Sequence, residues 1–254
     1  MPLTGGALDL RDTPFSGAYD LGNPDRSAWA QATRNYLDEH SEVNVIIWSW
    51  CGQADTTEEN IDLYLGLMNT LEAEYPNVSF VYMTGHLNGT GADGNLNQRN
   101  QQIRNYCLAH EKILYDFADI ESYDPDGLVN YMELLANDNC DYDSDSDGSR
   151  DTNWANDWQN SHTEDIDWYS CSAAHSQALN GNLKAYAAWW LWARLGGWAG
   201  EPSSTADSDD DGSDLSDDRH DTNDKALDFN GCFIESVYVG SLLVRKNGKS
   251  LIVN

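Results

Sequence analysis

The chain has 254 residues, of which 40% are hydrophobic and 11% aromatic, so wholesale disorder is excluded and a folded globular protein is expected. Fourteen basic residues against 43 acidic ones give a formal net charge of −29, which argues against nucleic acid or an anionic membrane surface as a partner. No run of about 18 apolar residues is present, so no membrane-spanning helix is expected. The first residues carry neither a basic nor an apolar segment of the kind found in signal peptides.

The acidic residues are concentrated in two segments. Residues 138–165 and 201–228 together carry 20 of the 43 acidic side chains. A halophilic protein would spread its acidic residues over the whole surface, and this is the less favoured explanation. Clustering instead favours local cation binding or a solvated linker.

The first half of the chain alternates between helical and strand patterns. Apolar runs at 43–49, 78–83 and 113–117 predict buried strands, and helices are predicted over 25–40, from the capping box at 56–59 to Pro76, and over 96–111. This alternation predicts a three-layer α/β/α, flavodoxin-like fold with a parallel sheet. Functional residues are then expected at the carboxyl ends of the strands.

The second half predicts one more helix and a separate tail. Residues 176–198 are apolar on nearly all sides, which predicts a buried helix that ends at Gly196-Gly197. A sugar-binding tryptophan platform is the alternative. We expect a domain over 1–200, an acidic linker over 201–230 and an apolar tail over 231–254. The sequence of the tail predicts a β-hairpin at its end. The tail must then pack on another part of the protein or pair with another chain.

The sharpest motif is an acidic loop within residues 141–154. Oxygen-bearing side chains at positions 1, 3, 5 and 9, with Gly148 at position 6, match a calcium-binding loop of EF-hand or dockerin type; they belong to Asp143, Asp145, Asp147 and Asp151. Position 12 holds Trp154 in place of the usual glutamate. Asp157 or Asp141 is expected to complete the shell. A second acidic run at 207–214 is interpreted as part of the linker.

The five cysteines lack zinc-finger spacing. Cys140 and Cys171 bracket the calcium-like loop, and a disulfide between them would hold a segment with little apolar content. Cys232 is then the odd thiol. A disulfide together with calcium predicts an extracellular or periplasmic location.

Polar residues follow the predicted strands. Gln53 comes after the first strand, His86 after the second, and His175 lies just before the last helix. A histidine at the carboxyl edge of a sheet is a candidate general base, and an amide is a candidate oxyanion donor.

The order and spacing of these elements resemble the SGNH (GDSL-type) hydrolase superfamily over roughly residues 20–198. The resemblance implies an ester hydrolase or deacetylase with His175 as base and Gln53 among the oxyanion donors. Ser172 stands three residues before His175, where the family has an Asp, and no Gly-Asp-Ser block precedes the helix at 25–40. The resemblance therefore implies a hydrolase scaffold whose nucleophile is absent or unconventional.

Three functions are consistent with the sequence. The first is a calcium-stabilised hydrolase acting on an ester or carbohydrate substrate. The second is a non-catalytic, calcium-dependent binding module that uses a cleft at the strand ends, with His86 and the Trp50 region, to bind a glycan or a protein. The third is a structural protein that self-associates by strand addition through its C-terminal tail.

Overall fold

The computed structural model describes residues 8–199, except 13, 17, 19, 23, 24 and 51, together with the backbone of residues 252–253. Its strands are β1 Asp9–Leu10, β2 Val45–Ile47, β3 Ser79–Met83, β4 Ile113–Tyr115, β5 Asp141–Tyr142, β6 Thr152–Asn153 and β7 Ile252–Val253. Its helices are α1 Ala28–Glu39, α2 Glu58–Glu74, α3 Asn95–Ala109, α4 Phe117–Ile120, α5 Trp154–Ser161 and α6 Ala178–Leu195, with a 3-10 helix at Tyr131–Leu134.

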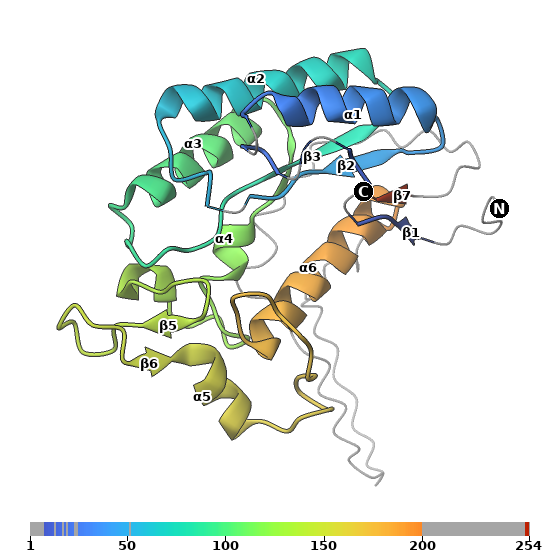
Figure 1. The fold of residues 1–254 in the computed structure, drawn as a ribbon. Coiled ribbons are helices and arrows are strands. Elements are labelled where there is room, and N and C mark those ends of the chain that lie inside the picture. Colours follow the sequence, from blue (N-terminus) through green and yellow to red (C-terminus); the bar gives the residue numbers. More distant parts are fainter. Residues whose placement is uncertain are drawn as a thin grey trace, which may run out of the picture.

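The main sheet is parallel and has the strand order β1-β7-β2-β3-β4. Strand β3 lies between β2 and β4, with Ile46 opposite Phe80 and Tyr82 opposite Leu114. Helices α1 and α2 lie together on one side of the strands, and α6 crosses on the other side (Figure 1). The predicted α/β class with a parallel sheet is therefore confirmed.

Helix α2 shows how local sequence fixes an element. Thr57 is its N-cap and accepts a hydrogen bond from the Asn60 backbone N–H, while Glu58 and Glu59 occupy the first turn, where acidic side chains favour the helix dipole. The helix ends at Glu74, just before Tyr75-Pro76, as the sequence predicts.

The core beneath α1 and α2 is rich in aromatic rings. Five of these rings are buried: Trp29, Trp48, Trp50, Tyr64 and Tyr82. The Trp29 ring contacts Trp48 and Tyr64, and the Tyr64 ring also contacts Trp50 and Tyr82. The Trp50 indole N–H donates to the Met83 carbonyl at 2.9 Å, and the Tyr64 hydroxyl accepts from the Met83 backbone N–H at 3.1 Å. The first bond joins the segment after β2 to the end of β3, and the second joins α2 to the end of β3.

Helix α6 differs from the expectation of burial on nearly all sides. One face is buried through Leu179, Leu183, Leu191 and Leu195. The opposite face is exposed, with Tyr186 45% and Trp189 58% accessible. The difference arises because α6 packs on α4 and α5 along one side only.

Residues 131–175 form a smaller lobe below the sheet (Figure 1). It contains the 3-10 helix, α5 and the antiparallel pair β5–β6, in which Asp141 lies opposite Asn153. No helix in the described part of the chain is long and apolar enough to cross a membrane. The predicted linker at 201–230, the acidic run at 207–214 and most of the predicted hairpin at 242–253 lie outside the described residues.

Candidate functional site

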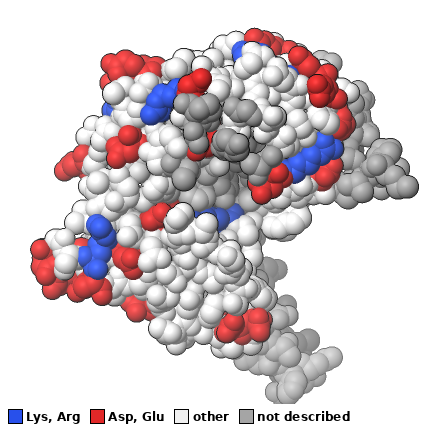
Figure 2. All heavy atoms as spheres, viewed as in Figure 1, with Lys and Arg blue, Asp and Glu red and all other residues white. Residues whose placement is uncertain are grey.

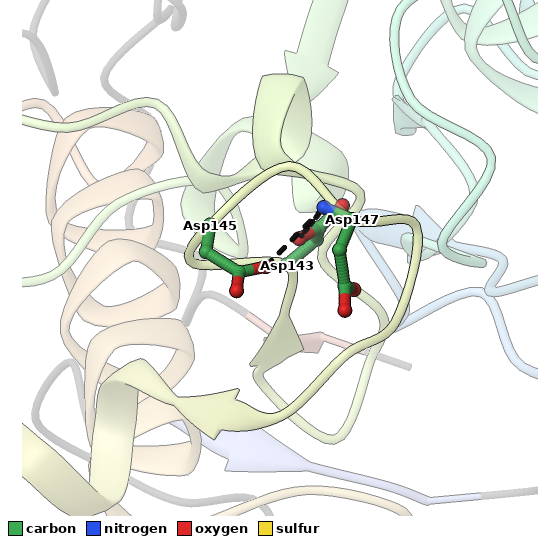
Figure 3. Close-up of side chains that lie close together, drawn as sticks. All are labelled: Asp143, Asp145 and Asp147. Atoms are coloured by element: carbon green, nitrogen blue, oxygen red, sulfur yellow. Dashed lines mark hydrogen bonds between the residues drawn. The ribbon is translucent and has the colours of Figure 1, made fainter.

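Three aspartates converge on the loop between β5 and β6. One carboxylate oxygen from each of Asp143, Asp145 and Asp147 lies within 4.8 Å of the others, so the group could hold a metal ion (Figure 3). Asp143 is buried, whereas Asp145 and Asp147 are exposed. Figure 2 shows acidic side chains gathered on the projection that this lobe forms.

The loop backbone shapes this group. The Asp147 N–H donates to carboxylate oxygens of both Asp143 and Asp145, each at 3.2 Å, and the Gly148 N–H donates to the second oxygen of Asp143 at 2.9 Å. Gly148 has φ +91°, a conformation that disfavours side chains. The tight turn required at position 6 of a calcium loop is therefore formed by the residue that the motif predicts.

Asp151, predicted as a fourth ligand, lies outside this group of three. Its carboxylate instead accepts hydrogen bonds from Ser144, through Oγ at 3.1 Å, and from the Thr152 hydroxyl, also at 3.1 Å. The bonds from Ser144 hold the pKa of Asp151 below its ordinary value, and bonds from Ser149 do the same for the pKa of Asp147. Both carboxylates are therefore ionised at neutral pH.

The residues expected to complete the shell have other partners or positions. Asp141 accepts hydrogen bonds from the side-chain amides of Asn139 and Asn153, both at 2.8 Å. Asp157 is exposed on α5, outside the group of three, and Trp154 is buried. A calcium ion takes six to eight oxygen ligands, so backbone carbonyls and water would supply those beyond the three carboxylates.

The strand-end residues are held by different neighbours. The Gln53 side-chain amide donates to Asp20 at 3.0 Å. His86 donates from Nδ1 to the Leu87 carbonyl at 2.7 Å and lies 3.9 Å from the Asp138 carboxylate. His175 is exposed at φ +57°, and its side chain has no hydrogen bond or ion pair with the described residues. The neighbours of the three predicted catalytic residues therefore differ: Asp20 for Gln53, Leu87 and Asp138 for His86, and solvent for His175.

Neither candidate base, His86 or His175, is paired with a described serine; the Ser161 hydroxyl instead contacts Nδ1 of the adjacent His162 at 3.0 Å. The predicted buried strand over 43–49 includes Ser49, but β2 ends at Ile47 and Ser49 is exposed. Ser16 and Ser172 are also exposed, and no described serine is hydrogen-bonded to His175. Asp116, which follows β4, accepts hydrogen bonds from the Arg104 side chain at 2.6 Å and from the Thr84 hydroxyl at 2.9 Å. It is therefore part of a buried structural network.

A buried charge pair near the strand ends was not predicted. The Lys184 ammonium on α6 donates to Glu121 at 2.6 Å, and the Leu87 N–H donates to the other Glu121 oxygen at 2.7 Å. The Glu121 side chain is 1% exposed and that of Lys184 is 17% exposed. Burial raises the pKa of Glu121, and Lys184 opposes this rise. The ion pair joins α6 to the end of α4, and the Leu87 bond joins the loop after β3 to the same carboxylate. Lys184, Glu121 and Leu87 are far apart in the sequence.

The predicted disulfide between Cys140 and Cys171 is not formed. Both residues are free cysteines: Cys140 is buried and faces the Ser176 hydroxyl at 3.6 Å, while Cys171 is exposed and faces the Ala178 carbonyl at 3.6 Å. Burial raises the pKa of the Cys140 thiol to about 12, which keeps it protonated and unreactive at neutral pH. Cys51 and Cys232 lie outside the described residues.

Comparison of the chain with protein-family models, with curated proteins and with solved structures found no match. The fold and the acidic loop define the class of this protein. It is a mixed α/β protein with a parallel sheet and an acidic loop that could hold a metal ion.

Proposed function

We propose that this chain is a calcium-binding α/β domain that acts as a binding module. The convergence of Asp143, Asp145 and Asp147 carries this proposal. Carboxylates brought this close repel one another unless a cation lies between them. An oxygen-only ligand set, together with glycine at position 6, favours calcium over zinc or copper.

The loop is connected to the strand ends through a short segment. The Asp143 N–H donates to the Leu134 carbonyl at 2.8 Å, and the Trp154 N–H donates to the Cys140 carbonyl at 3.1 Å. Three residues before Asp141, Asp138 lies 3.9 Å from His86. Calcium bound at the loop would therefore stabilise the segment that carries Asp138 and fix its position beside the sheet edge.

The proposed scaffold is the three-layer, SGNH-like fold. The proposed location is extracellular or periplasmic; it rests on the calcium loop alone, because the Cys140–Cys171 disulfide is not formed. The alternation of β2, α2, β3, α3 and β4, with α6 on the other side of the sheet, supports this scaffold (Figure 1). A glycan or an ester-bearing carbohydrate is the ligand class that we propose for the edge near His86.

Ester hydrolysis or deacetylation is the second candidate function. The observation that favours it is the position of His86 at the carboxyl edge of the sheet, within 3.9 Å of Asp138. The Leu87 carbonyl accepts the hydrogen bond from Nδ1 of His86 and so leaves Nε2 free to accept a proton, while Asp138 lies too far away for a hydrogen bond and contributes only a nearby negative charge. Acyl transfer also needs a nucleophile within reach of that base, and losing the nucleophile costs orders of magnitude in rate.

We expect negligible turnover of short-chain aryl esters and acetylated sugars by the chain as given. Because His175 has no partner among the described residues, His175→Ala should leave the residual rate unchanged. His86→Ala serves as the matched variant for the other candidate base. Steady-state assays in calcium-containing buffer measure both rates. A clear turnover that His86→Ala or His175→Ala destroys would replace the binding module with the hydrolase.

A further inference from the structure

Strands β1 and β2 follow each other along the chain, joined through α1, but they are not neighbours in the sheet. Strand β7 lies between them and runs parallel to both, with Val253 opposite Leu10 on one side and Val45 on the other. Adjacent strands lie about 4.8 Å apart, so β1 and β2 are separated by the width of one strand. By contrast, β2, β3 and β4 are direct neighbours.

This gap requires an occupant. Within the described residues, β1 pairs with no strand other than β7, so β7 alone attaches it to the sheet. On the other side of the gap, β2 and the residues after it are buried: Val45 is 1%, Ile46 0% and Trp48 5% exposed. Buried backbone N–H and C=O groups without partners are costly, and a parallel strand in the gap provides those partners.

We infer that the gap between β1 and β2 is a strand-binding groove and that its ligand is the C-terminal segment of the same chain, around Ile252–Val253. This segment reads Leu-Ile-Val, which suits a strand with neighbours on both sides. Between the end of α6 at Leu195 and Ile252 lie 56 residues. The end-to-end distance of an unstructured chain of that length is roughly 40 Å, so the segment can reach the groove within one molecule.

The alternative occupant of the groove is the same segment of a second copy of the chain, which corresponds to self-association by strand addition. A tethered segment has an effective concentration in the millimolar range. The intramolecular occupant therefore outcompetes a second copy at ordinary protein concentrations. Ile252–Val253 are then part of the sheet of the folded domain.

Hydrogen exchange followed by mass spectrometry on the full chain tests this inference. We expect the amides of Ile252 and Val253 to exchange at least about 100-fold more slowly than in an unstructured peptide, independently of protein concentration. Val253→Pro removes a backbone donor and should abolish this protection and lower the melting temperature by about 5 °C or more. Val244→Pro, the same substitution nine positions earlier in the sequence, is the matched control.

A synthetic peptide of residues 245–254 should bind Val253→Pro and restore its melting temperature. Exchange at the unstructured rate in the unaltered chain, or equal melting temperatures for the two proline variants, would overturn the inference. Protection that grows with protein concentration alongside dimer formation would also overturn it and would assign the groove to a second copy. None of these outcomes depends on calcium, so the proposed function is tested separately.

Discussion

Lys184→Met is expected to lower the free energy of unfolding by about 3–5 kcal/mol, because it leaves the buried Glu121 carboxylate without its cation. Arg34→Met is the matched control: the Arg34–Glu74 pair has a similar length, 2.6 Å, but its side chains are 24% and 41% exposed. Removing such a partly exposed pair should cost about 1 kcal/mol or less. Urea denaturation of the three proteins measures the difference.

The Glu121 pair also predicts a pH dependence. Because burial raises the folded-state pKa of Glu121, its ionised form is destabilising, and stability from this group is lost as the pH rises through that pKa. Lys184→Met raises the pKa further, so its defect should shrink as the pH falls toward the ordinary glutamate range near 4–5. Lys184→Met combined with Glu121→Gln should recover much of the stability at neutral pH. A defect for Lys184→Met no larger than that for Arg34→Met would show that the charge pair is not buried in solution.

Calcium is expected to stabilise the folded chain by about 2.7 kcal/mol at a hundredfold excess over its Kd, because only the folded loop brings the three carboxylates together. For a domain of this size this corresponds to a rise in melting temperature of roughly 5–10 °C relative to chelator. Asp145→Ala should abolish the rise. Asp93→Ala, which removes an exposed carboxylate elsewhere, should preserve it.

Thermal melts with calcium, with magnesium and with chelator measure this difference. Magnesium demands near-octahedral geometry and releases its water reluctantly, so it should give a smaller rise than calcium. Identical curves in calcium and chelator would contradict the prediction.

The sequence predicts the main helices and strands because each has a long hydrophobic pattern. That pattern shows whether the element is buried on one side or on all sides. Helix α2 has a cap, an apolar stripe and a proline stop, and β3 is a continuous apolar run. Strands β1, β5 and β6 have two residues each, too few to show any periodicity. Their positions are set by contacts with distant segments.

The candidate site was predicted where its residues are close in the sequence. Asp143, Asp145 and Asp147 lie within five residues of one another on one loop, so their spacing marks them as neighbours in the sequence, and the folded loop then brings their carboxylates together. The Glu121–Lys184 pair joins residues 63 positions apart, and no local pattern marks either of them. The spacing of Cys140 and Cys171 suggests a disulfide, but their sulfur atoms face different partners in the fold.

The most direct measurement for the central claim is a calorimetric calcium titration of the full chain after exhaustive chelation. The loop of Asp143, Asp145 and Asp147 predicts saturable binding that Asp145→Asn abolishes, since this substitution keeps the size of the side chain but removes a charge from the group. Asp93→Asn should bind calcium as the unaltered chain does. The absence of calcium binding, or binding that Asp145→Asn leaves unchanged, would contradict the assignment of calcium to this loop.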